Sequence, residues 1–182
     1  MKYSNEWLLS QPNYKDLRYL YFWGHRPSKD GRITKSCFSQ WFVSPFEVEG
    51  RHYLTAEHWM MWCKAITFND QEIADQILLE KDPAKIKKLG RRVKNYSDKT
   101  WREVRYQHVV DGNRYKFSQN PEMKAFLLST GPQIIVEASP YDAHWGIGMT
   151  ADEAVKLKDP AKWRGTNLLG YALMEVRDLL MG

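Results

Sequence analysis

The stretch Thr55-Ala-Glu-His-Trp-Met-Met-Trp-Cys-Lys-Ala-Ile-Thr67 carries apolar or aromatic side chains on nearly every face of a helix. A helix that is apolar all round is buried rather than laid on a surface. Thr55 is a suitable N-cap, because its hydroxyl can accept a hydrogen bond from the first helical turn. The sequence therefore predicts a buried helix from Thr55 to about Thr67.

Further helices are predicted between this segment and the C-terminus, each opened by a residue that can cap a helix. Their predicted starts are Asp70, Asp82-Pro83, Ser97 or Asp98, Asn120-Pro121, Thr150 and Asn167. Proline suits the first helical position, where its missing N–H leaves no bond unmade. Thr150 and Glu153 together match a capping box.

The segment before residue 55 has the aromatic, alternating character of short strands. The predicted strands, with one later β-rich run, are residues 19–23, 37–43, 46–48, 52–54 and 134–136. They are too few and too early for a doubly wound sheet. We therefore predict an α+β fold that is predominantly α-helical, with a few short N-terminal strands, as a single domain over residues 1–182.

Composition limits the class of function. The chain has 182 residues and a net charge of +5, with 43% hydrophobic and 27% charged residues, which excludes disordered and collagen-like proteins. The positive charge favours anionic ligands, either nucleic acid or phosphorylated metabolites. Because no run of five or more basic residues occurs, a nucleic-acid-binding tail is disfavoured. Eight Trp residues can fill a core or stack on flat rings in a cleft.

The two cysteines, Cys37 and Cys63, form no C-x-x-C pair, so we expect reduced thiols in a cytoplasmic protein. No apolar run approaches the roughly 18 residues of a membrane helix, and we expect no membrane association. The N-terminus lacks the apolar core of a signal peptide. The histidines show no H-E-x-x-H spacing, and we expect no metal ion or other cofactor.

Two carboxylates stand where core packing does not require them. Glu57 lies in the first turn of the buried helix, where it can simply complement the helix dipole. Its apolar neighbours also permit a desolvated cleft, in which a raised pKa would suit acid or base catalysis. Asp142 lies in a loop at 139–149, either as a turn residue or as a carboxylate beside the stacking ring of Trp145.

Most residues of a basic series from Lys85 to Arg114 are interpreted as the solvated faces of helices. Arg105 follows Trp101 by one helical turn, a spacing that lets a guanidinium and an aromatic ring line one pocket. Two carboxylates flanked by tryptophans fit cleavage through a cationic sugar-ring transition state. Glycoside and N-glycoside hydrolysis follow this chemistry.

Short motifs follow one another in a distinctive order. They include Phe22-Trp-Gly24, Phe38-Ser-Gln-Trp-Phe42, Thr55-Ala-Glu-His58, Leu89-Gly-Arg91, Glu137-Ala-Ser-Pro140, Trp145-Gly-Ile-Gly148 and Trp163-Arg-Gly-Thr-Asn167. The ordered set, over about residues 21–180, resembles the NADAR family of YbiA-like N-glycosidases. The resemblance implies a mostly helical α+β fold and metal-free hydrolysis of N-glycosidic bonds.

The resemblance also implies a substrate class. One branch of the family cleaves phosphoribosylamino-pyrimidine intermediates of riboflavin biosynthesis into ribose 5-phosphate and an aminopyrimidine. Another branch removes ADP-ribose from guanine in nucleic acid. We expect the first activity, with a small phosphorylated N-riboside as partner. The second activity, and a non-catalytic module that binds ADP-ribose or nucleic acid, stay open as alternatives, as do the oligomeric state and the stereochemical outcome.

Carried over by motif, Glu57 resembles the essential carboxylate and Asp142 the second polar site residue. We expect both to be catalytic, with Glu57 orienting water or stabilising the ribosyl cation and Asp142 assisting the water or the leaving ring. The other predicted site residues, which would bind substrate or its phosphate, are Trp101, Trp145, Arg105, Lys116, Arg91, Phe22, Gly24, Ser39 and Gln40. Family members often have Leu-Ser-Asn-Phe where this chain has Phe38-Ser-Gln-Trp41. Gln40 therefore replaces Asn near an expected substrate edge, and the substrate can differ accordingly.

Overall fold

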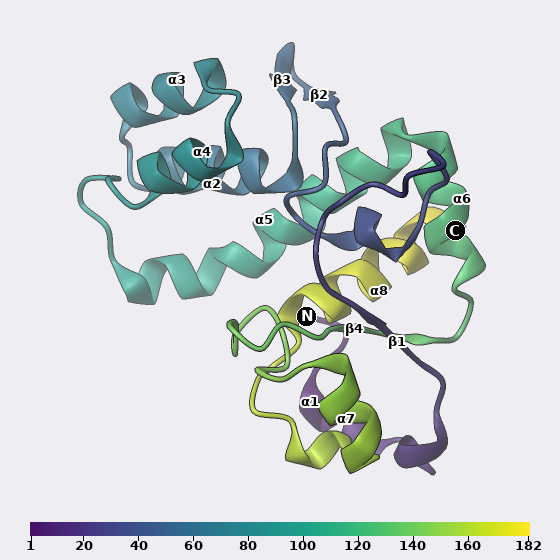
Figure 1. Cartoon of the computed structure of the whole chain (residues 1–182). Coiled ribbons are helices and arrows are strands. Elements are labelled where there is room, and N and C mark those ends of the chain that lie inside the picture. The colour runs from purple at the N-terminus through teal and green to yellow at the C-terminus, as the bar shows by residue number, and fades with distance from the viewer.

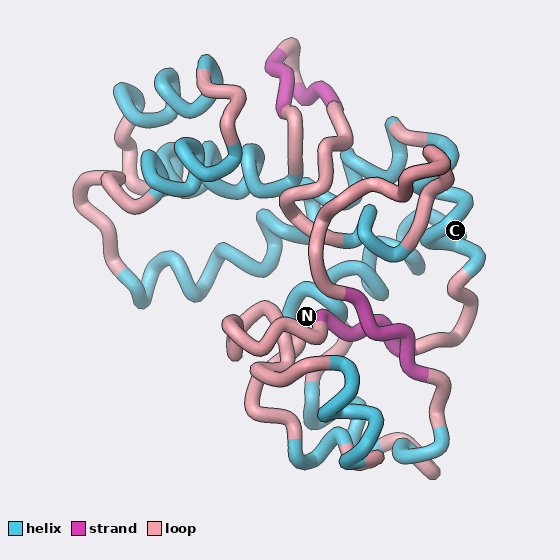
Figure 2. Tube along the Cα trace, in the orientation of Figure 1, coloured by secondary structure: helices cyan, strands magenta, loops and turns pink.

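A computed structural model describes the chain from Met1 to Gly182. Helices dominate it (Figures 1 and 2). The α-helices are α1 (Asn5–Ser10), α2 (Ala56–Thr67), α3 (Gln71–Leu79), α4 (Pro83–Gly90), α5 (Asp98–Gln119), α6 (Pro121–Ser129), α7 (Ala151–Leu157) and α8 (Leu168–Met181). The strands are β1 (Tyr19–Phe22), β2 (Phe46–Val48), β3 (Arg51–Tyr53) and β4 (Ile134–Glu137). The predicted α+β, predominantly helical fold is confirmed.

The strands form two separate pairs. β1 and β4 are parallel, with Phe22 opposite Glu137, although more than 100 residues separate them in the chain. β2 and β3 form an antiparallel hairpin. In Figure 1, α2, α3 and α4 make a lobe at one end of the long helix α5, and α1 and α7 lie at the opposite end of the molecule. α8 packs against both α5 and β4, so this helix connects the long helix with the β1–β4 pair.

The predicted helix starts are confirmed, and most caps act as expected. The capping side chains that accept a backbone hydrogen bond are Thr55, Asp70, Asp82, Ser97 and Thr150, the last within a capping box. Helix α2 is buried along most of its length, as its apolar composition predicts. None of the helices is long and apolar enough to cross a membrane.

The prediction of a strand at 37–43 is wrong. A short 3-10 helix, Lys35–Phe38, begins there and is followed by a turn in which the Phe42 N–H donates to the Ser39 carbonyl. The Lys116 ammonium from α5 binds the carbonyls of Cys37 and Ser39. In a strand, those two carbonyls would accept hydrogen bonds from a neighbouring strand. The local sequence pattern does not show that Lys116, more than 70 residues away, takes that place.

Helix α8 begins in direct contact with β4 because Gly170 has no side chain. A Cβ there would lie 2.1 Å from the Ile135 carbonyl oxygen and 2.5 Å from Asn167 Oδ1. We expect Gly170→Ala to lower the free energy of unfolding by about 1–3 kcal/mol, because the helix must move off the strand. Urea unfolding measures this change. Leu179→Ala, in the exposed part of the same helix, is the control, and an equal effect of both changes would contradict the close packing.

Candidate active site

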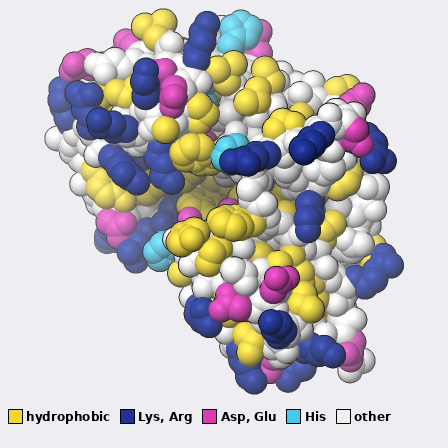
Figure 3. Space-filling model, in the orientation of Figure 1, with side chains coloured by type: hydrophobic (Ala, Val, Ile, Leu, Met, Phe, Trp, Pro, Cys, Tyr) yellow, Lys and Arg dark blue, Asp and Glu magenta, His cyan; other side chains and the backbone are white.

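A cavity of about 320 Å³ lies between α2, the loop after β4 and the start of α8. Its lining residues are Ser39, Gln40, Trp41, Glu57, Met60, Met61, Lys87, Glu137, Asp142, His144, Trp145 and Leu169. Figure 3 shows the hollow near the centre of this face, with hydrophobic side chains at its edge and acidic side chains inside. The volume is at the lower end of the range of small-ligand sites. No group of three or more His, Cys, Asp or Glu side chains is arranged to hold a metal ion.

Glu57 is held at the second position of α2. The Thr55 hydroxyl caps the helix, and the Glu57 N–H donates to the Gln40 carbonyl at 2.9 Å. The side chain is only 7% exposed. Burial raises the pKa of the Glu57 carboxyl, and the charge of Asp142 raises it further, whereas Lys87 and Lys64 act in the opposite direction. Glu57 therefore lies in a desolvated cavity with a raised pKa, as one of the two interpretations of its sequence position expected.

Glu137, the last residue of β4, faces the same cavity. Asn167 fixes the end of this strand, because its side chain accepts from the Glu137 N–H at 2.9 Å and donates to the Ile135 carbonyl at 3.0 Å. Glu137 Oε2 is buried and has no hydrogen-bond partner in the protein. Burial, with the charges of Asp142 and Glu57, raises the pKa of Glu137 to about 8.

Glu137 was not predicted as a site residue. It belongs to the quoted motif Glu137-Ala-Ser-Pro140, but nothing local distinguishes it from an ordinary strand-end glutamate. Its position at the carboxyl end of a β-rich run was the one sequence feature that could have indicated a site residue. The carboxyl ends of parallel strands are where ligands bind in many α/β proteins.

Asp142 combines the two roles that the sequence left open. Its Oδ1 accepts from the backbone N–H groups of His144 and Trp145, at 2.8 and 2.7 Å, which turns the loop. The same residue lines the cavity. A Cβ at Gly146 would lie 2.8 Å from the Glu137 carbonyl oxygen, so this glycine lets the loop pack directly against the end of β4.

Two tryptophans line the cavity, and each has a cation over its ring. Lys87 Nζ lies 5.3 Å from the Trp41 ring centroid, and the Arg105 guanidinium lies 5.6 Å from that of Trp145. Arg105 therefore pairs with Trp145 and not with Trp101. Lys87 was grouped with the solvated basic series and Trp41 was noted only as part of a departure from the family pattern, so neither was predicted as a site residue.

Two further predicted site residues line the cavity, and the others do not. Ser39 and Gln40 line the cavity, and the buried Gln40 Oε1 has no protein partner. Trp101 does not line it, because the ring is 5% exposed and stacks on His108 at 5.8 Å. Four more do not line it either. Arg105 lies over the Trp145 ring without lining the cavity, and Phe22 is buried against Phe38. Gly24 is exposed after β1 with a φ of +84°, and Arg91 is the exposed C-cap of α4.

The structure contradicts the prediction that Lys116 holds phosphate. Its side chain is completely buried, and its ammonium donates to the Cys37 carbonyl at 2.6 Å and to the Ser39 carbonyl at 2.9 Å. Burial lowers the pKa of Lys116 to about 8. Lys116 therefore supports the turn that carries Ser39 and Gln40 and does not reach the cavity itself.

We expect Lys116→Met to lower the free energy of unfolding by about 1–3 kcal/mol, because two buried carbonyls lose their donor. Chemical denaturation measures this effect. Lys99→Met, at an exposed position of the same helix, should change stability little. An unchanged stability together with a raised KM in Lys116→Met would instead restore the predicted role in phosphate binding.

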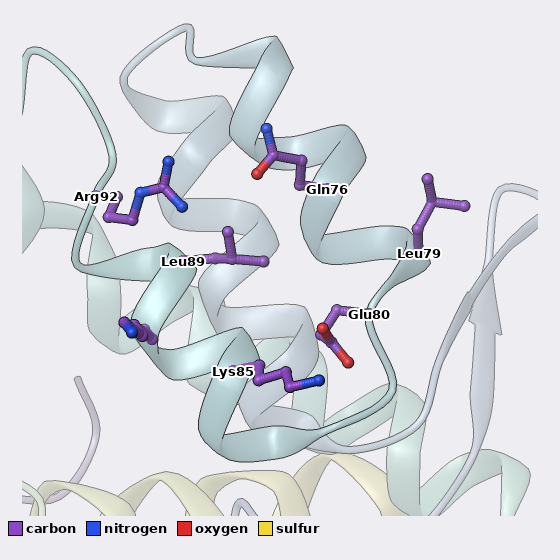
Figure 4. Close-up of a pocket in the computed structure, with 7 residues that line it drawn as sticks. Gln76, Leu79, Glu80, Lys85, Leu89 and Arg92 are labelled. Atoms are coloured by element: carbon purple, nitrogen blue, oxygen red, sulfur yellow. The ribbon is translucent and has the colours of Figure 1, made fainter.

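A larger groove of about 430 Å³ lies between α3 and α4 (Figure 4). Its lining residues are Gln76, Leu79, Glu80, Lys85, Lys88, Leu89 and Arg92. None of these side chains is buried, so the groove has no desolvated acid or base. Its cations form the solvated face that was predicted for most of the basic series. The smaller cavity around Glu57 and Glu137 is therefore the candidate active site.

Comparison with known proteins identifies the family of this chain. The family model for the NADAR domain matches residues 21–181, a range that contains every residue lining the cavity. The chain belongs to the NADAR domain family. The predicted resemblance is thereby confirmed.

This NADAR chain is similar in sequence to proteins named N-glycosidases and similar in fold to one solved structure. It is 42% identical to an N-glycosidase of Acanthamoeba polyphaga mimivirus, over 88% of this chain and 95% of the relative. It is 32% identical to N-glycosidase YbiA of Escherichia coli (strain K12), over 79% and 80% of the two chains. The NMR structure of E. coli YbiA superimposes with a TM-score of 0.70 at 29% identity, covering 90% of this chain and 85% of the other. The predicted enzyme class, a hydrolase of N-glycosyl compounds, agrees with these names.

Proposed function

We propose that this NADAR protein hydrolyses the N-glycosidic bond of phosphoribosylamino-pyrimidine intermediates of riboflavin biosynthesis, releasing ribose 5-phosphate and an aminopyrimidine. One observation carries the proposal: the buried Glu57 and the partly buried Glu137, whose Oε2 is inaccessible and unpaired, face one cavity that is lined by tryptophans and by Lys87. This set offers a carboxylate, a proton donor, flat apolar surfaces and a cation. N-riboside hydrolysis requires these same groups.

The charges around the two glutamates assign their protonation states. Burial and the charge of Asp142 raise the pKa of Glu57, while the cations Lys87 and Lys64 lower it. Glu57 also stands at the N-terminus of a helix, where a negative charge is favoured. For Glu137, burial and the charges of both Asp142 and Glu57 raise the pKa, and Lys87 is the one cation that lowers it. When carboxyl groups share one site, the proton stays on the group with the least favourable surroundings for charge. We therefore assign the negative charge to Glu57, which has two cations and a helix N-terminus beside it, and the proton to Glu137.

The reaction then follows from these two states. As the bond between ribose C1′ and the amino nitrogen breaks, Glu137 gives its proton to the departing nitrogen. The Glu57 carboxylate stabilises the positive charge that develops on the sugar ring and accepts a proton from the attacking water. Water supplies the new hydroxyl at C1′. Exchange with solvent returns the proton from Glu57 to Glu137, so the enzyme ends in its starting state.

Substrate binding is assigned to the walls of the cavity. The faces of Trp41 and Trp145 suit a pyrimidine ring. Lys87 and Arg105 bring positive charge beside these rings, which suits the 5′-phosphate. Asp142, which was predicted to be catalytic, and Asn167 are positioning residues in this assignment, because they orient Trp145 and Glu137 through backbone hydrogen bonds.

A second candidate is the hydrolysis of ADP-ribosyl-guanine in nucleic acid, and one observation favours it. Trp23 and Tyr141 are 56% and 87% exposed, and their ring centroids lie 5.9 Å apart. Tyr141 directly precedes the cavity residue Asp142. Exposed aromatic rings of this kind stack on bases of single-stranded nucleic acid.

A direct assay separates these candidates. The protein is incubated with a phosphoribosylamino-pyrimidine and, separately, with a DNA oligonucleotide carrying ADP-ribosyl-guanine. We expect free ribose 5-phosphate from the first substrate. ADP-ribose release from the oligonucleotide alone would establish the second candidate. DNA binding that weakens steeply with salt, without release from either substrate, would indicate a binding module.

A further inference from the structure

Helix α2 separates the candidate active site from a second cavity of about 300 Å³. Glu57 and Met60 face the first cavity, whereas Trp59, Trp62 and Cys63 line the second. Residues spaced three or four apart share one face of a helix, so the two cavities lie on different faces of α2. The β2–β3 hairpin and α5 complete the second cavity, and Figure 1 shows the hairpin standing beside these helices.

Four aromatic side chains, from Tyr53, Trp59, Trp62 and Tyr115, are among the residues that line this second cavity. The Tyr53 and Trp59 rings meet edge to face at 5.1 Å, and Trp62 lies 5.8 Å from Tyr53. Tyr115, from α5, contacts Trp59 at 5.4 Å. Such a surface suits a flat ring, which it can contact through both faces and edges.

Two buried polar atoms at this wall have no partner in the protein. Tyr53 is 1% exposed and its hydroxyl makes no hydrogen bond, and neither does the buried Trp62 Nε1–H. Buried polar groups are nearly always hydrogen-bonded. A flat ligand with hydrogen-bond acceptors on its edge, such as a nucleobase, would satisfy both donors.

The rim of the cavity adds a positive charge. The Arg51 guanidinium lies 5.3 Å from the Trp62 ring centroid, and its ion pair with the exposed Glu49 is long, at 3.5 Å. Arg51 is therefore available to an anionic group beside a ring that stacks in the cavity. The cavity contains no buried carboxylate, so its residues fit binding rather than hydrolysis.

We propose that this cavity is a second, non-catalytic site that binds a nucleoside monophosphate. The base lies among Tyr53, Trp59 and Trp62, with its acceptors toward the Tyr53 hydroxyl and the Trp62 N–H. The phosphate lies at Arg51. This inference stands independently of the reaction proposed above, because it uses no residue of the candidate active site.

Calorimetric titration with AMP and with UMP tests the proposal. We expect one of the two to bind, and Trp62→Phe or Tyr53→Phe to weaken that binding by about 5- to 10-fold through loss of one hydrogen bond. Arg51→Met should weaken it further and should remove the preference for the nucleotide over its nucleoside. Trp41→Ala, in the candidate active site, is the control and should leave the affinity unchanged.

The unfolding temperature of each variant shows whether weaker binding comes from the lost contact or from a misfolded protein. Tyr53→Phe removes a hydroxyl that lacks a partner, so the unliganded variant should unfold at the same temperature as the parent protein or at a higher one. Weaker nucleotide binding at unchanged stability would support the site. Binding that Trp41→Ala abolishes and Trp62→Phe leaves intact, or no binding of either nucleotide at about 1 mM, would overturn the proposal.

Discussion

Glu57→Gln is expected to lower kcat by about 100- to 10,000-fold, the usual effect of removing an acid–base or charge-stabilising side chain. Glutamine has nearly the same shape but carries no charge, so it cannot stabilise the sugar cation or accept a proton from water. Because burial raises the pKa of the Glu57 carboxyl, loss of the charge should leave the thermal unfolding midpoint equal or higher. Steady-state release of ribose 5-phosphate measures the rate.

The matched control is Glu122→Gln. Glu122 also lies in the first turn of a helix, α6, but is exposed. If Glu57 only complemented the helix dipole, both variants would lose a few tenths of a kcal/mol to about 1 kcal/mol of stability and neither would lose activity. That outcome would contradict the catalytic role of Glu57.

Glu137→Gln is expected to lower kcat/KM by about 100-fold or more at pH 7, because the departing nitrogen loses its proton donor. The pH profile gives the more specific result. The pKa of Glu137 is raised to about 8, so the parent protein should lose activity as the pH rises through 8 and Glu137 ionises. In Glu137→Gln the residual activity should no longer fall in that range. An alkaline limb that persists in the variant would show that another group supplies the proton.

The same pKa predicts how Glu137 affects stability. An ordinary glutamate in the unfolded chain ionises near pH 4.5, whereas Glu137 in the folded protein keeps its proton to about pH 8. Between these values the folded state binds more protons, so the contribution of Glu137 to stability falls as the pH rises. Urea unfolding at pH 5 and pH 8 should therefore show Glu137→Gln gaining stability relative to the parent protein at the higher pH. Glu122→Gln should show no such change.

Local patterns in the sequence predicted most of the helices and the position of Glu57. Thr55, Asp70, Asp82, Ser97 and Thr150 each cap the helix that they were expected to open. A cap depends on residues within one turn, and the burial of α2 depends on its own apolar composition. Local patterns and the family resemblance together predicted Glu57, Asp142 and Trp145 as site residues. All three line the cavity.

Tertiary structure decided which other side chains reach the cavity. Trp101 and Lys116 turn into the interior of the protein, while Trp41 and Lys87 line the cavity, although nothing in their immediate neighbours distinguishes the two pairs. Glu137 becomes part of the site only because β4 pairs with the distant strand β1 and because Asn167 holds the end of β4. Caps and apolar faces are set by neighbours in sequence, whereas burial and pKa are set by whatever the folded chain brings close.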